Sequence, residues 1–421
     1  MKKVLVHGSN ESLGKFFSEK LSKKKYDCVA ILTDDEKVKN PSVEIIKPDN
    51  LPKFVYSLID AIVLTDKNTR SRDIEYFKNF VEPKKIICWN PDGYLEHFSE
   101  KNSDGTEIFY MEGLEFHIKN SDDDRFFRNT RYSLYLNNQF YALDEKDYPA
   151  KMAELYQKTV GKPLDWNNLK TWSEKMQWLK LYDSTPIKTR LADKFLVRNW
   201  IADKIGTDYL FPLLGVWDNF DEIDFDAMPN QFVLKCNHGC AMNIICRDKK
   251  TFDIEDAREK INAWLAIDFG MVYFEPHYSN IKRKIIAEKF MTDGENLDLT
   301  DYKFWCFNGK PFIVQYQTDT TSVLKIDLFD MNWKLTNFVR TDHPNSEHPE
   351  KVQKPKNFEL MKKLAAKLCK EFIFVRVDFY EIEGKVYIGE MTFTPGTGNL
   401  NFKPDGTNEY LGSLMTLPFE K

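Results

Sequence analysis

Glycine, cysteine and long apolar runs are all scarce in this chain. Only 18 of its 421 residues are glycine and 7 are cysteine. Several cysteines lie inside apolar segments, a pattern that favours reduced thiols over disulfides, and we therefore expect a cytoplasmic protein. No stretch of eighteen apolar residues occurs, so no membrane-spanning helix is expected. Residues 1–8 predict a strand and a turn rather than a secretory signal.

Charge of one sign is not in excess either. The 60 basic and 65 acidic side chains give a formal net charge of -5. A general nucleic-acid surface normally needs a basic excess, so nucleic acid is not an expected partner. The length allows about two or three domains. A hydrophobic share of 42% is enough to give each of them a core.

Residues 1–95 alternate between strands and helices. Strands are predicted at 3–7, 28–33, 43–46, 61–64 and 85–89, with helices such as 12–24 and 72–80 between them. This rhythm is typical of a parallel, doubly wound sheet, and we expect an α/β, Rossmann-like domain over 1–95. Residues 96–148 are less regular and are expected to form an annex and linker.

Residues 149–421 combine helices with later antiparallel strands. Helical patterns cover 149–180, 191–205 and 358–371, and strands are expected at 231–247, 284–291, 301–308 and 311–318. Helices followed by antiparallel strands favour an α+β module. The predicted architecture is therefore an α/β domain followed by an α+β module.

Two alternating strands near the end of the chain each carry one acid. Asp378 lies in Val375–Tyr380, Glu390 lies in Lys385–Thr392, and a short turn joins the two strands. On neighbouring antiparallel strands the two carboxylates can face each other, and like charges that close require a cation. Hard oxygen ligands suit Mg²⁺ bound to a nucleotide phosphate. Arg376 lies two residues before Asp378 and should point to the same face.

A lysine followed by a small-residue loop indicates a phosphate site. Lys235 ends an apolar strand, and Cys236–Asn243 then leads into the next strand. Loop amides, including that of Gly239, could bind phosphate oxygens while the lysine adds positive charge. A surface hairpin is the plainer alternative. Lys194 could reach a second phosphate from a helix, with a solvated lysine as its alternative.

The segment at 285–291 could line an adenine. Its apolar residues include Met291, Glu288 could accept a hydrogen bond from the adenine amino group, and Glu295 could bind the ribose. An edge strand with a charged turn is the alternative.

The order of these features resembles the ATP-grasp superfamily and its D-alanine–D-alanine ligase branch. The resemblance implies ATP and Mg²⁺ as cofactors. It makes Lys194 and Lys235 the phosphate lysines, with an adenine hinge at Glu288, Lys289 and Met291, and Glu295 as the ribose acid. It also makes Asp378 and Glu390 metal ligands beside Arg376. Thr392 stands where the superfamily often has a ligating asparagine, so its hydroxyl, its backbone carbonyl or a water molecule would replace that ligand.

A narrower resemblance covers about residues 150–421. The segments 174–180, 192–194, 235–239 and 301–311 resemble the TupA-like ATP-grasp group, which is associated with teichuronopeptide and capsular polysaccharide synthesis. The group usually has Gly-Ser-Gly where this chain has Gly239-Cys240-Ala241. The resemblance implies that a carboxylate, often a uronic acid, is joined to an amine.

Five further residues are weaker candidates. Catalytic roles are considered for His238 and Lys303, for which a packing histidine and an ion pair with the neighbouring Asp301 are the alternatives. Substrate contacts are considered for Arg340, Asn399 and Asn401, and for Arg340 an exposed loop is the alternative. Cys236, His238 and Cys240 do not follow known zinc-finger spacings, so zinc is not expected.

The turn at 7–14 is similar to the first turn of dinucleotide-binding folds. Glu11 would repel a pyrophosphate, which argues against NAD. ATP-grasp enzymes often begin with a Rossmann-like domain that shapes the substrate site without NAD, and this is the favoured interpretation. A sugar nucleotide, with Ser9 and Asn10 near its phosphates, is the alternative. Asp34 and Asp35 after the second strand could meet a ribose, although acids are common at such a turn.

The expected function is an ATP-dependent carboxylate–amine ligase that forms an amide through an acylphosphate. The expected acid is a uronic acid such as UDP-glucuronate, the amine is small, and the product serves capsular polysaccharide synthesis. Three alternatives stay open: a sugar or alcohol kinase on the same fold, a nucleotide-binding scaffold without turnover, and an NAD-dependent sugar epimerase. The oligomeric state is also open, and a homo-oligomer is compatible with the sequence.

Overall fold

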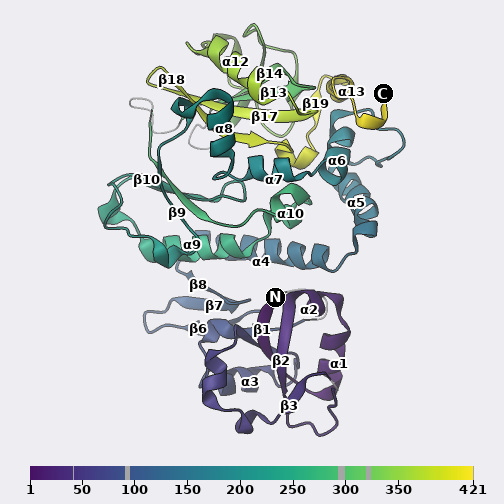
Figure 1. Cartoon of the computed structure of the whole chain (residues 1–421), viewed down its shortest axis with the longest axis vertical. Coiled ribbons are helices and arrows are strands. Elements are labelled where there is room, and N and C mark those ends of the chain that lie inside the picture. Colours follow the sequence, from purple (N-terminus) through teal and green to yellow (C-terminus); the bar gives the residue numbers. More distant parts are fainter. Residues whose placement is uncertain (41, 91–94, 293–298, 319–323, 421) are drawn as a thin grey trace. The chain divides into compact units, whose positions relative to one another are not determined.

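The computed structural model describes residues 1–40, 42–90, 95–292, 299–318 and 324–420. The chain forms two compact units (Figure 1). The first unit consists of Met1–Asp144 together with Ile254–Val272, and the second of Glu145–Asp253 together with Tyr273–Lys421. The segment 254–272 therefore lies between two stretches of the second unit in the sequence, but it folds with the first unit.

A parallel sheet forms the centre of the first unit, as predicted. Its strand order is β3-β2-β1-β4-β5. The strands are β1 (Lys2–His7), β2 (Tyr26–Leu32), β3 (Glu44–Ile46), β4 (Ala61–Leu64) and β5 (Ile86–Cys88), and the helices are α1 (Asn10–Ser18), α2 (Lys20–Lys25) and α3 (Arg70–Phe77). Separate cores form with α1 and with α3, so both faces of the sheet are covered. The predicted single helix at 12–24 is in fact α1 and α2.

Residues 96–148 are more regular than the sequence suggested. They form an antiparallel sheet of β6 (Phe98–Lys101), β7 (Glu107–Met111) and β8 (Leu114–Ile118), followed by the long helix α4 (Ser121–Tyr141). The acidic run at 122–124 occupies the first turn of α4, where acids favour the helix dipole, and the Asn120 side chain caps this end. The inserted helices α9 (Ile254–Ala266) and α10 (Phe269–Val272) complete the unit.

The second unit begins with helices and contains two main antiparallel sheets. The helices are α5 (Tyr148–Val160), α6 (Trp172–Tyr182), α7 (Pro186–Ala192), α8 (Val197–Ile205), α11 (Pro276–Ser279), α12 (Phe358–Leu368) and α13 (Thr407–Ser413). The first sheet has the order β11-β10-β12-β9 and contains β9 (Leu213–Trp217), β10 (Phe232–Cys236), β11 (Asn243–Cys246) and β12 (Ile285–Lys289).

The other large sheet has the order β15-β14-β13-β17-β18. Its strands are β13 (Asp301–Phe307), β14 (Lys310–Thr318), β15 (Lys325–Asp330), β17 (Phe374–Ile382) and β18 (Lys385–Thr392), and the short β16 (Val339–Arg340) pairs with β19 (Phe402–Lys403) nearby. The α+β character expected for this part of the chain is confirmed.

The two faces of this second sheet differ. Phe304, Val377 and their neighbours on one face pack against residues of α8 and α12. The other face is apolar at one end, where Trp305 and Phe374 pack against Trp172 of α6. Lys303, two residues before Trp305 on β13, lies on the same face. The change from apolar to polar within one face leaves charged groups beside a rigid core.

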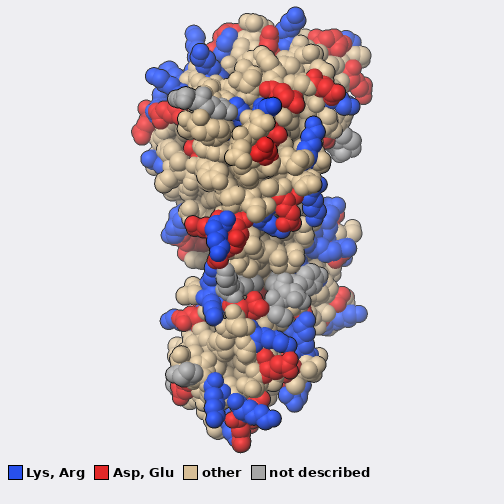
Figure 2. Space-filling view, turned by 90° about the vertical axis from the view of Figure 1, so that its right-hand side faces the viewer, with Lys and Arg blue, Asp and Glu red and all other residues tan. Residues whose placement is uncertain are grey.

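The surface mixes charges of both signs. On the face shown in Figure 2, Lys and Arg side chains are interspersed with Asp and Glu. Within the described ranges, no helix has both the length and the apolar character needed to cross a bilayer.

Candidate active site

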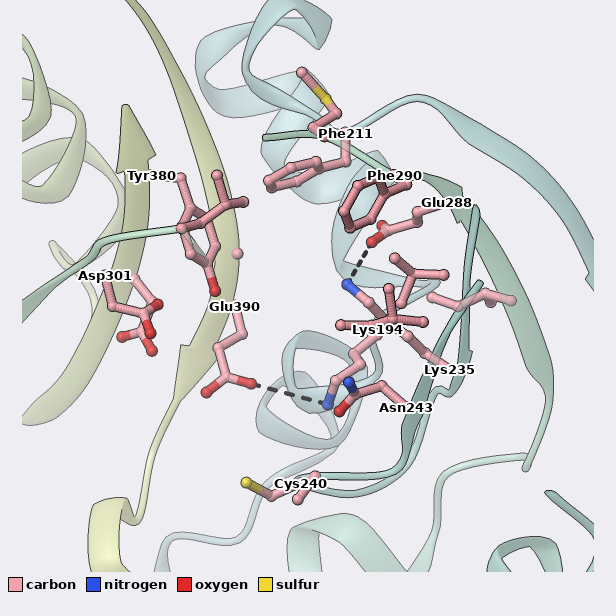
Figure 3. A pocket seen from close by; sticks show the side chains of 18 of the residues that line it. Lys194, Phe211, Lys235, Cys240, Asn243, Glu288, Phe290, Asp301, Tyr380 and Glu390 are labelled. Atoms are coloured by element: carbon pink, nitrogen blue, oxygen red, sulfur yellow. Dashed lines mark hydrogen bonds and ion pairs between the residues drawn. The ribbon is translucent and has the colours of Figure 1, made fainter. Parts of the chain in front are cut away.

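A cavity of about 590 Å³ lies between the two large sheets of the second unit (Figure 3). Cavities of this size are typical of small-molecule sites, which span about 300–1,000 Å³. Lys235 and Glu288 lie on the wall formed by the first sheet, and Lys303, Asp378 and Glu390 lie on the opposite wall.

The two acids face each other across neighbouring strands. Asp378 on β17 is directly opposite Glu390 on β18, as the alternation of the two strands predicted. Arg376 joins them: its Nε donates to Asp378 Oδ1 at 2.7 Å, and one terminal nitrogen donates to Asp378 Oδ2 at 2.6 Å and to Glu390 Oε1 at 2.8 Å. A guanidinium therefore supplies positive charge between the acids. Thr392 accepts from the same nitrogen at 3.0 Å and donates to Glu390 at 2.9 Å.

The charges around Glu390 keep it ionised. Burial alone would raise the pKa of Glu390, but Lys194, Arg376 and Lys303 outweigh burial and bring the pKa to about 2. Asp378 is only 1% exposed, and burial raises its pKa against the opposing charges of Arg376 and Lys303. Asp378 in turn raises the pKa of Arg376 although burial opposes it, so the guanidinium stays charged.

Lys303 bridges two acids on the same wall. Its Nζ lies 3.1 Å from Asp378 Oδ2 and 3.1 Å from Asp301 Oδ1. The ion pair with Asp301 that the sequence left as an alternative is therefore present, together with a second one. Asp301, Lys303 and Asp378 all line the cavity, so Lys303 stays at the cavity wall although it forms both ion pairs.

On the wall formed by the first sheet, Glu288 holds Lys235 in place. One carboxylate oxygen of Glu288 lies 2.6 Å from Lys235 Nζ and the other lies 3.2 Å from Arg198. Arg198 also donates to the carbonyl oxygen of Phe211 at 2.7 Å. Both oxygens of Glu288 are thus engaged by cations, whereas the sequence suggested a hydrogen bond to an adenine amino group.

The loop after β10 closes one end of the cavity. Lys194 Nζ donates to the carbonyl oxygen of Gly239 and lies 3.8 Å from Glu390 Oε2 (Figure 3). Ala241 adopts a left-handed conformation with φ 56°, at the position where the related group usually has glycine. Cys240 is exposed and lines the cavity. The loop therefore forms with Gly239 but without a glycine at 241, where Ala241 takes a strained conformation.

Apolar side chains complete the cavity. Phe211 and Phe290 lie near each other at one end (Figure 3), and Lys289 and Met291 also line it. The guanidinium of Arg247 lies 5.4 Å from the ring centre of Phe290. The predicted ribose residue, Glu295, lies outside the described residues.

Seven other predicted residues do not line this cavity: His238, Gly239, Arg340, Arg376, Thr392, Asn399 and Asn401. Arg340 is only 8% exposed and is bound by Asp342 and by Gln315, so it does not lie in an exposed loop. His238 is buried in the turn after β10. In the described part of the chain, no three His, Cys, Asp or Glu side chains converge in a way that could hold a metal ion, and this includes Cys236, His238 and Cys240.

The first unit carries its own carboxylate where a dinucleotide fold would bind phosphate. Asp35 Oδ2 accepts the backbone N–H of Asn10 at the start of α1, at 3.0 Å. Glu11 is exposed and pairs with Lys15. A phosphate at this helix end would meet both acids, which argues against a dinucleotide here.

The sequence model of the TupA-like ATP-grasp family matches residues 174–416. This match spans more than half of the chain, and the chain belongs to that family. It contains most of the helix α6, both large sheets and the cavity residues described above. No curated protein matches the chain.

The solved structures that match this chain include three ligases or synthetases. D-alanine–D-alanine ligase from Bacillus anthracis is 14% identical with a TM-score of 0.26, covering 94% of this chain and 88% of that protein. N5-carboxyaminoimidazole ribonucleotide synthetase from Thermus thermophilus is 7% identical with a TM-score of 0.28, covering 93% and 71%. Phosphoribosylamine–glycine ligase from Thermotoga maritima is 10% identical with a TM-score of 0.29, covering 93% and 68%. The family assignment rests on the match over 174–416.

Sequence reasoning missed Arg198, Phe211 and Tyr380 as parts of this site. Phe211 and Tyr380 line the cavity, and Arg198 holds Glu288 from behind it. Tyr380 follows Asp378 by two residues on an alternating strand, so the period of two could have placed it. No comparable signal marks Arg198, because its partner Glu288 is ninety residues away.

Proposed function

We propose that this protein is an ATP-dependent ligase that joins a carboxylate to an amine. The observation that carries the proposal is the opposed pair Asp378 and Glu390, joined by Arg376, facing Lys235 across a cavity in a member of the ATP-grasp family. ATP-grasp enzymes are ATP-dependent ligases.

The residues present fit ATP and Mg²⁺. Asp378 and Glu390 offer hard oxygen ligands, and Lys194 Nζ lies 3.8 Å from Glu390 Oε2. Asp378 and Glu390 would hold Mg²⁺, which would neutralise part of the charge of the phosphates. Lys194 and Lys235 are placed to offset the remaining charge of the phosphates. The apolar wall at Phe211 and Phe290 suits the face of an adenine.

The proposed reaction has two steps. The substrate carboxylate forms a bond to the γ-phosphorus as the bond to ADP breaks, which gives an acylphosphate. The amine then adds to the acyl carbon and loses a proton as phosphate leaves, so an amide forms. Arg376 would stabilise the oxyanion of the second step, and Lys303 would hold the transferred phosphate. Positioning and charge compensation are sufficient, and no covalent enzyme nucleophile is needed.

The substrates we propose are a uronic acid, such as UDP-glucuronate, and a small amine, with the product used in capsular polysaccharide synthesis. Support comes from the segments shared with the TupA-like group. The setting we propose is the cytoplasm, where the seven cysteines, all free, would stay reduced.

The test combines uronic acids with amines and follows ADP, phosphate and product mass. The expected result is release of both ADP and phosphate only when acid and amine are present, with a product lighter than their sum by one water. Asp378→Asn should lower this rate by at least about a thousandfold, in line with the loss of a central charged group. Glu371→Gln is the control, because Glu371 is 61% exposed and pairs with Lys204 outside the cavity.

Two outcomes would contradict the proposal. Phosphate transferred to an alcohol, without free phosphate, would identify a kinase. ATP binding without any turnover in the presence of the substrate panel, and equal behaviour of Asp378→Asn, would identify a nucleotide-binding scaffold.

A further inference from the structure

A buried arginine anchors a row of hydrogen bonds that ends at the cavity wall. Arg340 donates to both carboxylate oxygens of Asp342, and its Nη1 donates to Gln315 Oε1 at 3.0 Å. Gln315 Nε2 then donates to Gln317 Oε1 at 3.1 Å. Arg340 and Gln315 are 8% and 1% exposed and do not line the cavity, whereas Gln317 does. The row therefore runs from the interior of the second unit to the cavity.

The chemistry of arginine fixes the direction of this row. A guanidinium has donors but no acceptor, so the atom of Gln315 that faces Arg340 has to be its carbonyl oxygen. The NH₂ group of Gln315 is then turned to Gln317, where it needs an oxygen. The NH₂ group of Gln317 is left at the end of the row, and among the described residues none accepts a hydrogen bond from it. Arg340 thereby leaves Gln317 with an unused donor at the cavity wall.

An acceptor lies beside this donor. Gln317 on β14 is directly opposite Asp301 on β13, so the two side chains share one face of the sheet, and both line the cavity. The Cβ atoms of such opposite residues are about 4.5–5.5 Å apart. Asp301 pairs with Lys303, but Lys303 is shared with Asp378 and does not fully compensate the charge of Asp301. A neutral donor and a negative acceptor are thus presented side by side.

Sugar hydroxyls fit this pair better than an anionic oxygen does. A hydroxyl both donates and accepts, so neighbouring hydroxyls of one sugar ring can bind the Asp301 carboxylate and the Gln317 amide together. A phosphate or carboxylate oxygen can only accept, and it would meet the negative charge of Asp301. The lysines that suit an anion, Lys194 and Lys235, lie on the opposite side of the cavity from Asp301 (Figure 3).

The pair also lies away from the acids that would hold the metal ion. Strand β13 separates β14, which carries Gln317, from β17, which carries Asp378. Two strand spacings place the backbones of Gln317 and Asp378 about 10 Å apart. A ligand atom bound by Gln317 is therefore not one of the oxygens around that metal ion, but belongs to another part of the ligand.

We propose that Gln317 and Asp301 form a binding site for the hydroxyls of a sugar, and that Arg340 is a positioning residue that orients Gln317 through Gln315. The sugar belongs either to the nucleotide, as its ribose, or to the acid substrate, and the hydroxyl chemistry is the same. The second source rests on the proposed ligase function. The site gives sugar selectivity to a cavity whose other charged groups suit phosphates and a metal ion.

The experiment uses the full chain with substitutions along the row. Gln317→Met keeps the side-chain length but removes the donor. Gln315→Glu still accepts from Arg340 but cannot donate to Gln317, and Arg340→Met removes the anchor. Gln353→Glu is the control for exchanging an amide for an acid, because Gln353 donates to the carbonyl oxygen of Lys351 at 3.2 Å and does not line the cavity.

Calorimetry with Mg²⁺ measures the affinity of each variant for three probes. These are ADP, an ADP whose ribose lacks both hydroxyls (dideoxy-ADP), and UDP-glucuronate in the presence of ADP. If the sugar is the ribose, Gln317→Met should weaken ADP binding about tenfold, as the loss of one hydrogen bond allows, and dideoxy-ADP binding less than about twofold. If it belongs to the acid, UDP-glucuronate binding should weaken about tenfold and ADP binding less than about twofold.

The positioning role has its own expected result. Gln315→Glu and Arg340→Met should weaken binding of the same probe about threefold, because Gln317 stays in place but is free to turn its amide. Arg340→Lys should recover part of the loss of Arg340→Met, since it keeps a donor for Gln315. Gln353→Glu should bind all three probes as the unaltered protein does.

Unchanged binding of both ADP and UDP-glucuronate by Gln317→Met would overturn the hydroxyl site, and equal losses for all three probes would show a merely structural effect and overturn it as well. Unchanged binding by Gln315→Glu and Arg340→Met would overturn the role of Arg340. If the unaltered protein binds UDP-glucuronate but not ADP, the proposed function fails, while the UDP-glucuronate titrations still decide on the hydroxyl site. Binding of neither would overturn both.

Discussion

Arg198 should control nucleotide binding without touching the nucleotide. It does not line the cavity, yet it lies 3.2 Å from Glu288 and donates to the carbonyl oxygen of Phe211 at 2.7 Å. Glu288 in turn holds Lys235, whose Nζ is 2.6 Å away. Replacing Arg198 by methionine would leave Glu288 with a single cation and would release the backbone at Phe211.

The expected loss follows from the burial of these groups. Hydrogen bonds to charged groups contribute about 1.5–3 kcal/mol when buried, and the side chains of Arg198 and Glu288 are 15% and 10% exposed, so solvent screens them only in part. Part of this energy is retained because Lys235 still binds Glu288. We therefore expect Arg198→Met to weaken ADP binding about tenfold, or about 1.4 kcal/mol, in calorimetry with Mg²⁺ present.

A double-mutant cycle with Glu288→Gln separates an indirect effect from a direct one. If Arg198 acts through Glu288, the double variant should bind ADP only a little more weakly than the single variant with the larger loss of ADP affinity. Lys204→Met is the control on the same helix, because Lys204 pairs with the exposed Glu371. Additive losses in the cycle, or unchanged affinity of Arg198→Met, would refute the reasoning.

Two further predictions concern stability. Ala241→Gly should stabilise the fold by about 1 kcal/mol in urea unfolding, because Ala241 has φ 56° and glycine adopts this conformation without strain; a loss of stability would show that the loop is not strained there. Burial raises the pKa of Glu275 to about 7 from 4.5, although the charge of Lys180 and the hydrogen bond from Thr394 oppose it. The folded state then binds this proton more tightly than the unfolded state, so stability should fall by up to about 3 kcal/mol as pH rises from about 4.5 to above 7. Glu275→Gln should make thermal unfolding less dependent on pH in this range, and equal slopes for both proteins would contradict the assignment.

Most strands that carry the candidate site could be predicted from their alternation. In β13 and β17 the residues Lys303, Arg376 and Asp378 alternate with buried apolar residues, and a period of two fixes which of them share a face. The pairing of Asp378 with Glu390 followed from the short turn that joins β17 and β18. Local pattern was sufficient because these partners are close in sequence.

Partners that are distant in sequence could not be predicted. Nothing in the pattern of 254–272 indicates that it packs with the first unit, since an amphipathic helix fits any apolar surface. The contact of Asp35 with α1 depends on how the first two loops meet, and an acid after a strand is common at any turn. The annex at 96–148 was underestimated because its short strands are interrupted by a charged turn and its helix has a weakly apolar face.

The position of the acids next to a core explains how this site could combine rigidity with charge. Arg376 is paired across the sheet with Trp305, which is fully buried against Trp172 of α6. The same helix, through Gln177 and Lys180, holds the chain that follows the acids. Helix α6 therefore contacts two parts of the chain next to the acids: the apolar end of the sheet face and the turn that follows β18. A disturbance of α6 should reach the acids by both routes, whereas the lysine wall depends on Arg198 and a different sheet. Substitutions that disturb the acids through α6 should on this basis differ from those that disturb the lysine wall through Arg198.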